Sequence, residues 1–358
     1  AAGEAPSRML SWSGQLAVGQ YRLRLQDADG VREEWPVIVA PATAYSGDFQ
    51  RSWLVAVQLY GLRSPRNWGI GDFSDLARVI ELAASWGADG VGLNPLHALF
   101  PERPNDCSPY APNSRLFLNP LYIDVEAVPE LPESFAVDHR EVLRRVRGSA
   151  LVDYAAIADL KWRALRAAFA HFRATRDSNR VAAFDEFRAA GGATLRRFCC
   201  FEMLRRRFRR PWWTWPAPWR EADDAACDDL SSGKERDEIV FVAFVQWIAD
   251  QQLRACRDLA RRSGLRVGLY LDVAVGVSPD GFDAWNEQQA ISRHLAVGAP
   301  PDGLNTAGQD WGLAGFNAAG LLSCGFAPFR DMLRAVMRHA GAIRLDHAFG
   351  LKRLYLVP

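Results

Sequence analysis

The chain has 358 residues, of which 49% are hydrophobic and 24% are charged, as in an ordinary soluble enzyme with a sizeable core. The formal charge of +1 argues against a protein that recruits nucleic acid or an anionic membrane through a strong overall field. No apolar run is long enough to cross a bilayer, and the first residues do not resemble a secretion signal. Because the sequence does not begin with Met, we expect residues upstream to have been removed.

Six cysteines are present, and they show neither a CxxC pair nor the spacing of Cys/His metal ligands. This pattern indicates reduced, mostly buried thiols in a cytoplasmic protein, with no metal site. The cysteines are Cys107, Cys199, Cys200, Cys227, Cys256 and Cys324.

The first forty residues differ in pattern from the rest. Polar and apolar residues alternate over 21–25, turn-forming residues occupy 27–30, and a second β-prone run covers 34–39. Alternation, a turn and a second run predict a β-hairpin. We interpret residues 1–42 as the tail of a small N-terminal β domain.

From residue 53 onward the pattern is one of short apolar runs and amphipathic stretches. Asp72 is placed to cap a helix over 73–86, and a second helix is predicted over about 329–339. The apolar runs have the length and composition of buried parallel strands. These four strands are predicted at 54–59, 87–95, 268–273 and 342–346.

Long segments separate the predicted strands. Loops are expected over about 99–135 and 276–317, and a helical, Arg-rich stretch covers 139–262 with a break at 211–218. Strands followed by helices and long loops are typical of a TIM (β/α)₈ barrel, an α/β fold. Only four of the eight strands are found, so we expect residues 43–358 to form the N-terminal half of such a barrel, with 139–262 as a helical insertion.

The fourth strand ends in the residues most suited to catalysis. Alternation places Arg344 and Asp346 on the same face, and a neighbouring guanidinium favours the ionised carboxylate that a nucleophile needs. On spacing alone, a structural Arg–Asp pair is the more common explanation. His347 follows Asp346 directly, so alternation predicts that it points away and has no acid/base role.

Several segments, in the same order as in the family, resemble the 4-α-glucanotransferases (amylomaltases, glycoside hydrolase family 77), relatives of the α-amylases. Residues 343–350 resemble the family's nucleophile strand, and 67–73 resemble the loop after its first strand. The substrate loop is matched by 108–110 with 113–120, and the most distinctive family segment by 298–302 with 308–312.

The resemblance implies an enzyme that transfers α-1,4-glucan segments between malto-oligosaccharides, with glucose among the acceptors, by a retaining double displacement. It implies no metal and no organic cofactor. Asp346 would be the nucleophile, held ionised and aligned by Arg344. The implied or candidate substrate-binding residues are Tyr110, stacking on the sugar at the cleaved bond, Ser108 beside it, Gln309 and Trp311 in the donor subsites, Asp280 near the acceptor side, and Asn94 and His97 at the end of the second strand.

The family's acid/base glutamate follows its fifth strand, and a further aspartate follows the seventh. Neither motif is present, so we expect both to lie beyond Pro358 and the 358 residues alone not to catalyse. The alternatives to a transferase are an α-amylase-type hydrolase and a catalytically incomplete glucan-binding fragment.

Four further features have two interpretations each. Trp212, Trp213, Trp215 and Trp219 form either a glucan platform or an aromatic plug under the helical insertion. The basic run 205–210 suggests nucleic acid, but the balanced charge favours a solvated helix face paired with the acidic stretch 221–229. Asp272 either positions the site or caps its strand. For His97, a structural role is the alternative to substrate binding.

Overall fold

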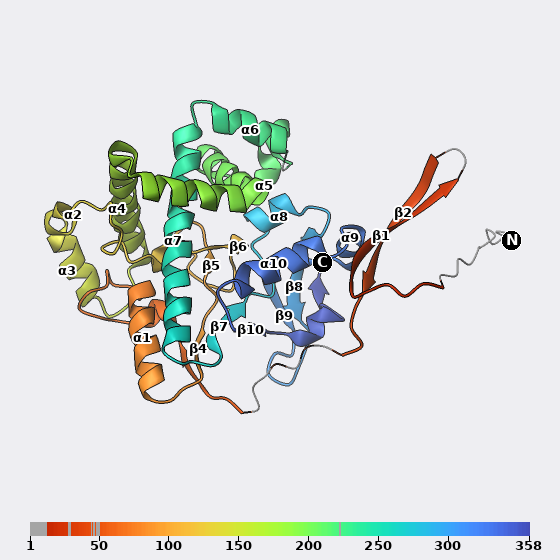
Figure 1. Ribbon diagram of the computed structural model, residues 1–358, viewed down its shortest axis with the longest axis horizontal. Helices are drawn as coiled ribbons and strands as arrows, with labels where there is room; N and C mark the ends of the chain where they lie inside the picture. The colour runs from red at the N-terminus through yellow and green to blue at the C-terminus, as the bar shows by residue number, and fades with distance from the viewer. Residues whose placement is uncertain (1–12, 28–29, 44, 46, 48–50, 222) are drawn as a thin grey trace.

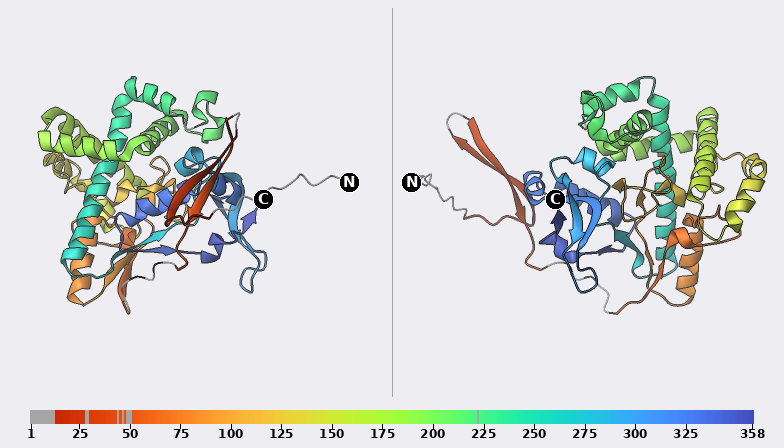
Figure 2. Two further views of the ribbon diagram at one scale, coloured as in Figure 1. Left: turned by 45° about the vertical axis from the view of Figure 1, so that its right-hand side comes forward. Right: turned by 180° about the vertical axis from the view of Figure 1, so that it is seen from behind.

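The N-terminal part of the chain is a β-hairpin, as predicted. The structure is a computed structural model that describes residues 13–358 except 28–29, 44, 46, 48–50 and 222. Strands β1 (Gly19–Asp27) and β2 (Gly30–Val39) pair antiparallel, and the predicted turn includes 28–29, which lie outside the described residues. The hairpin projects from the rest of the chain in Figure 1 and in the right view of Figure 2, and it contacts the rest of the chain at helix α9 (Ala318–Ser323).

A four-stranded parallel sheet forms the centre of the molecule. Its strands are β3 (Leu54–Val57), β4 (Gly90–Leu93), β7 (Gly268–Val273) and β10 (Ala342–Leu345). They lie side by side in chain order, each parallel to the next. All four predicted strands are therefore confirmed, and their carboxyl ends meet at one edge of the sheet, where α/β proteins place ligands.

The sheet is closely covered by helices. Strand β4 is buried at all four positions, because α1 (Phe73–Ser85) packs against it and α7 (Arg236–Arg262) packs against both α1 and β7. The neighbouring strands also approach each other closely at Gly90, where a Cβ atom would lie 2.6 Å from the carbonyl oxygen of Gly268. Only glycine fits at this position.

Helix α1 begins at the predicted cap. The buried Asp72 carboxylate accepts hydrogen bonds from the N–H groups of Ser74 (3.0 Å) and Asp75 (3.1 Å). The Asp75 carboxylate in turn accepts from the Asp72 N–H at 3.1 Å, which completes a capping box. Arg66 contacts both carboxylates, so the cap also anchors the preceding loop.

Residues 139–262 are mostly helical, as predicted, and the predicted break at 211–218 falls between α5 and α6, where the chain forms two short 3₁₀ turns. A second irregularity, within α5, was not predicted. Helix α5 changes direction at Gly192, where φ is 52° and ψ is −142°. Figure 1 shows α4, α5 and α6 gathered on one side of the sheet, with the long α7 connecting them to it. The insertion consists of α3 (Arg140–Gly148), α4 (Tyr154–Thr175), α5 (Ser178–Phe208), α6 (Asp224–Ser232) and α7, preceded by α2 (Ser134–Asp138).

The four tryptophans in and beside the break at 211–218 are buried or partly buried, which does not suit an exposed platform for glucan. Trp212 and Trp215 are 4% and 0% exposed, and Trp213 and Trp219 are partly buried. The indole N–H of Trp215 donates to the Arg210 carbonyl at 2.8 Å, and that of Trp212 to a carbonyl outside the insertion. The structure therefore favours the aromatic plug.

Among the residues that the structure describes, the basic run at 205–210 makes no ion pair with the acidic stretch 221–229, so the predicted pairing was wrong. Asp224 in the acidic stretch pairs instead with Arg197 at 2.7 Å, because α6 packs beside the middle of α5 and not beside its end. The arginines of the run find other glutamates: Arg205 pairs with Glu202, Arg206 with Glu238 and Arg207 with Glu235.

The segments expected to be loops contain further strands. Residues 276–317 include α8 (Phe282–Asn286) and the antiparallel strands β8 (Ile291–Ala299) and β9 (Gln309–Phe316), with β11 (Leu356–Val357) pairing on β8. The hairpin was missed because two register shifts interrupt its alternation. Within 99–135, β6 (Ser114–Leu118) pairs with β5 (His97–Ala98).

The remaining predictions of local structure hold. Helix α10 (Ala327–Met337) corresponds to the helix predicted over 329–339. The six cysteines are unpaired, and four of them are buried. In the part of the chain that the structure describes, no helix combines the length and apolar character needed to cross a membrane.

Replacing Asp72 with Ala is expected to lower the free energy of unfolding by about 2 kcal/mol, because it removes a buried cap and two of its hydrogen bonds. The matched control is Asp177→Ala, which removes an exposed cap with the same pattern of hydrogen bonds at α5. We expect the control to cost at most about 1 kcal/mol. Urea unfolding of both variants tests this, and equal losses would contradict the special role of Asp72.

Candidate active site

The side chains at the carboxyl edge of the parallel sheet are joined by one guanidinium. Arg344 on β10 lies opposite Asp272 on β7 in the strand register. Its Nη1 donates to Asp272 Oδ2 at 2.8 Å, and its Nη2 donates to Asp346 Oδ2 at 2.6 Å. The predicted meeting of Arg344 and Asp346 is therefore present, and a third residue belongs to the group.

Asp346 is held in its ionised form. Its partial burial opposes ionisation, but the hydrogen bond from the His347 N–H, at 2.8 Å, and the charges of His347 and Arg344 outweigh it and lower the pKa of Asp346. The Asp346 side chain is 41% exposed, so a ligand can reach it. A carboxylate that is ionised, fixed and accessible is suited to act as a nucleophile.

Asp272 positions its neighbours and does not simply cap a strand. Its side chain is only 7% exposed, and its Oδ2 also accepts from the Tyr110 hydroxyl at 3.4 Å. Burial raises the pKa of Asp272 in spite of the Arg344 charge. The interactions with Arg344 and Tyr110 therefore stabilise the buried Asp272 carboxylate. They also connect the loop at residue 110 to the ends of β7 and β10.

His347 lies close to Asp346, so the prediction that it points away was wrong. Its Nε2 is 3.9 Å from Asp346 Oδ2. The alternation argument fails here because β10 ends at Leu345 and His347 adopts a left-handed conformation, with φ of 51°. Its ring contacts the indole of Trp311, with the centroids 4.6 Å apart.

The structure thereby brings Trp311 and Tyr110 to the neighbourhood of Asp346. The Trp311 indole N–H donates to Gln309 Oε1 at 3.0 Å, so these two residues of β9 form a pair. The Tyr110 side chain is 46% exposed. Ser108 Oγ accepts from the Tyr110 N–H at 3.4 Å and so shapes the loop that carries the ring.

Asp280 belongs to a separate cluster at the rim. Its Oδ2 lies 3.0 Å from Arg103 Nη1, and its Oδ1 accepts from the Ser278 hydroxyl at 2.7 Å. This ion pair connects the loop after β5 with the loop after β7.

Asn94 and His97 lie inside the fold. Asn94 Oδ1 accepts from the Leu59 N–H at 2.8 Å, and its Nδ2 donates to the Tyr122 hydroxyl. His97 is buried, and its Nε2 accepts from the Ala274 N–H at 3.3 Å. Burial, with the nearby Arg115 charge, lowers the pKa of His97 to about 3, so the ring is neutral. Asn94 thus connects the segments that follow β3 and β4, and His97 connects β5 with the segment that follows β7.

A network of buried hydrogen bonds, which could not be seen in the sequence, fixes the start of the segment 113–120. The buried Asn113 donates from Nδ2 to Glu202 of α5 at 2.7 Å and accepts at Oδ1 from the Phe282 N–H at 2.8 Å. Asp283 accepts from the Ser114 hydroxyl at 2.6 Å. Burial raises the pKa of Glu202 to about 7. The only sequence signal was that Asn113 and Ser114 begin a segment already singled out.

A cavity of about 500 Å³ opens beside Asp346. It is mainly apolar, with Val273, Phe316, Phe329 and Leu345 in its lining, and Asp346 and His347 on one side. Its size is within the range of small-molecule sites. Among the described residues, no group of three or more His, Cys, Asp or Glu side chains is arranged to hold a metal ion.

We expect Arg344→Met to raise the pKa of Asp346, because the substitution removes a charge and a hydrogen bond that favour the carboxylate. Carboxyl ¹³C NMR titration would measure this, with the Asp346 signal identified by its loss in Asp346→Asn. Arg334→Met, on the exposed face of α10, is the control and is expected to leave the pKa unchanged. An unchanged pKa in Arg344→Met would show that the His347 N–H alone controls the carboxylate.

Comparisons with known proteins point to one family. The family model described as 4-alpha-glucanotransferase matches residues 57–358. A 4-alpha-glucanotransferase of Haemophilus influenzae is 36% identical over 95% of this chain and 50% of its own length, and one of Mycobacterium tuberculosis is 37% identical over 96% and 49%. The chain thus spans about half the length of the curated relatives it matches.

Two solved structures share the fold. The crystal structure of amylomaltase from Corynebacterium glutamicum superposes with a TM-score of 0.81 at 33% identity, covering 97% of this chain and 48% of that one. An amylomaltase from Streptococcus agalactiae, in complex with acarbose, gives a TM-score of 0.73 at 18% identity, covering 86% and 61%. At that identity the second likeness concerns the fold alone.

Proposed function

The chain belongs to the 4-alpha-glucanotransferase family, and on this premise we propose that it acts in the transfer of α-1,4-glucan segments between malto-oligosaccharides. The observation that carries the proposal is the ionised, accessible Asp346 held by Arg344 at the end of a parallel strand. We further propose that β3, β4, β7 and β10 are the first four strands of a (β/α)₈ barrel, and that the N-terminal hairpin is the tail of a small β domain.

In the first step, an oxygen of Asp346 attacks the anomeric carbon of the donor glucan. The bond from that carbon to the glycosidic oxygen breaks, and a covalent glucosyl ester forms on Asp346. The hydrogen bonds from Arg344 and from the His347 N–H fix the carboxylate for this attack. In the second step, a hydroxyl of the acceptor sugar attacks the same carbon and releases Asp346, while the proton of that hydroxyl passes to the carboxylate that served as the acid in the first step.

The departing oxygen needs a proton from a second carboxyl group, which retaining enzymes place about 5–5.5 Å from the nucleophile. Asp272 is engaged with Arg344 and Tyr110, so we do not assign this role to it. We assign it to the glutamate that follows the family's fifth strand, which we propose lies outside residues 1–358. On this assignment, a polypeptide of these residues alone binds glucan and does not turn it over.

Aromatic side chains near Asp346 suit a sugar substrate. Tyr110 presents an exposed ring, and Trp311 lies against His347. The axial C–H groups of glucose pack against such faces, so we propose that Tyr110 stacks on the sugar at the cleaved bond, with Ser108 beside it. We place Gln309 and Trp311 in the donor subsites and Asp280 on the acceptor side. Asn94 and His97 then support the substrate site from beneath it.

The proposal extends to partners and location. The substrates are malto-oligosaccharides with glucose among the acceptors, no metal or organic cofactor takes part, and the protein acts in the cytoplasm. The relatives at 36% and 37% identity are named 4-alpha-glucanotransferases, which supports an oligosaccharide ligand.

Incubation with maltotriose tests the activity. Transfer gives glucose and a ladder of longer oligomers, whereas an α-amylase-type hydrolase gives a net gain of reducing ends. In protein that also carries the acid/base glutamate, we expect Asp346→Asn to lower activity by at least about 10⁴-fold, because the nucleophile is lost. Asp331→Asn, an exposed change on α10, is the control and should keep full activity. A ladder that persists in Asp346→Asn would disprove the assigned nucleophile.

The intact mass of the protein is measured with the assay. If the mass equals that of the 358 residues and maltotriose is not converted, calorimetric titration with maltoheptaose distinguishes a glucan-binding fragment from a protein that does not recognise glucan. If the same mass gives a genuine ladder, the acid/base lies among the residues present, and Asp272→Asn becomes the next variant.

Two substitutions of Tyr110 separate its ring from its hydroxyl. We expect Tyr110→Ala to lower kcat/KM roughly ten- to hundredfold, since the ring surface that contacts sugar is lost. Tyr110→Phe keeps the ring and loses only the 3.4 Å bond to Asp272, so its loss should be no more than a few-fold. Steady-state kinetics with maltotriose, on protein that also carries the acid/base glutamate, measures both. If both variants lost kcat/KM equally, the hydroxyl of Tyr110, and not its ring, would be responsible for its contribution.

A further inference from the structure

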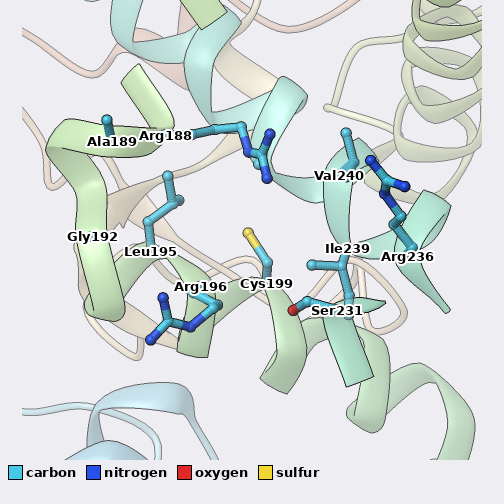
Figure 3. A pocket seen from close by; sticks show the side chains of 11 residues that line it. Arg188, Ala189, Gly192, Leu195, Arg196, Cys199, Ser231, Arg236, Ile239 and Val240 are labelled. Atoms are coloured by element: carbon cyan, nitrogen blue, oxygen red, sulfur yellow. The ribbon is translucent and has the colours of Figure 1, made fainter. Parts of the chain in front are cut away.

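The helical insertion encloses a second cavity, distinct from the one beside Asp346. It has a volume of about 330 Å³ and lies between α5, α6 and α7 (Figure 3). Three of the side chains that line it are arginines, Arg188, Arg196 and Arg236, and none is a carboxylate. In a chain with 43 basic and 42 acidic residues, a cavity whose charged lining residues are all cations is a clear separation of charge.

Figure 3 shows the Arg188 side chain extending over the cavity and the Arg196 guanidinium directed away from its centre, so Arg188 and Arg236 are the cations available to a ligand. Arg236 makes no ion pair with any residue that the structure describes. Arg188 pairs with Asp185 at 3.4 Å, and this aspartate side chain is 61% exposed. Exposed pairs of this kind contribute little free energy, so an anion in the cavity can compete for the arginine.

Arg196 is the most engaged of the three. It lies 2.7 Å from Asp228 and 3.5 Å from Asp224, whose side chains are 59% and 44% exposed. Asp224 is also bound by Arg197 through two bonds of 2.7 Å, so it does not depend on Arg196. The acidic partners of Arg196 are therefore at the surface, outside the cavity lining.

The interior of the cavity is apolar. Leu195, Ile239 and Val240 line it, and Figure 3 shows the Cys199 sulfur pointing toward its centre. Burial raises the pKa of the Cys199 thiol, so the thiol stays neutral and does not compete for the cations. The break of α5 at Gly192 leaves the space open, because a Cβ atom there would meet nothing within 4 Å.

We propose that this cavity binds a small phosphate monoester, with the phosphate held by Arg188 and Arg236 and the body of the molecule against Leu195 and Ile239. Guanidinium groups bind phosphate through paired, charge-assisted hydrogen bonds, and a dianion matches several of them at once. The second half of α5 begins at the cavity, and the partial positive charge of a helix N-terminus adds to the attraction. The cavity volume is at the lower end of the range for ligand sites, so the organic part of the phosphate monoester must be small.

The test is calorimetric titration of the full chain with three probes. Phenyl phosphate carries both the charge and an apolar body, inorganic phosphate carries only the charge, and benzyl alcohol carries only a comparable body. We expect phenyl phosphate to bind more tightly than inorganic phosphate, and benzyl alcohol not to bind. Added maltotriose should leave the affinity for phenyl phosphate unchanged, because the cavity is separate from the Asp346 site.

Variants locate the binding. Arg236→Gln and Arg188→Gln are each expected to weaken phenyl phosphate roughly tenfold, by loss of a charge-assisted interaction. Arg145→Gln, an exposed arginine on α3, is the control and should bind like the unchanged protein. Circular dichroism confirms that each variant is folded. The proposal is overturned if phenyl phosphate does not bind, if both cavity variants bind it normally, or if benzyl alcohol or inorganic phosphate binds equally well.

Discussion

The guanidinium of Arg344 connects two strand ends, and the arrangement around Asp346 depends on it. The parallel register places Arg344 beside Asp272, and burying that carboxylate without a partner would be costly. Arg344 supplies the partner with one nitrogen and binds Asp346 with the other. The interaction that stabilises the sheet edge therefore also orients the candidate nucleophile, and a change in one strand end is transmitted to the other.

The features that could be predicted from the sequence are local. The cap at Asp72, the four strands and the meeting of Arg344 with Asp346 depend on residues a few positions apart, where periodicity and side-chain direction are reliable. His347 shows the limit of the same rule, because one left-handed residue after a strand reverses the expected direction. The hairpin of β8 and β9 was hidden in the same way, by bulges that interrupt its alternation.

Contacts between distant parts of the chain could not be predicted. Asp272 and Arg344 are 72 positions apart, and Asn113 and Glu202 are 89 apart. No pattern within either segment indicates its partner, since only the folded topology brings them together. The pairing of the basic run with the acidic stretch failed for this reason. Charge complementarity was correctly noticed, but the packing of α6 beside the middle of α5 selected Arg197 for Asp224.

On the proposed mechanism, the balance between transfer and hydrolysis would depend on water at Asp346. Its side chain is 41% exposed, so in this arrangement solvent reaches a glucosyl ester formed on it. The intermediate survives until an acceptor arrives only if bound sugar and its aromatic contacts displace that water and orient the attacking hydroxyl. Tyr110 and Trp311 are both connected to the Asp346 group, through Asp272 and through His347. Asp272 and His347, which adjoin the Asp346 group, thus contact the aromatic residues that would cover it. We therefore expect the binding of sugar and the protection of the ester from water to occur together.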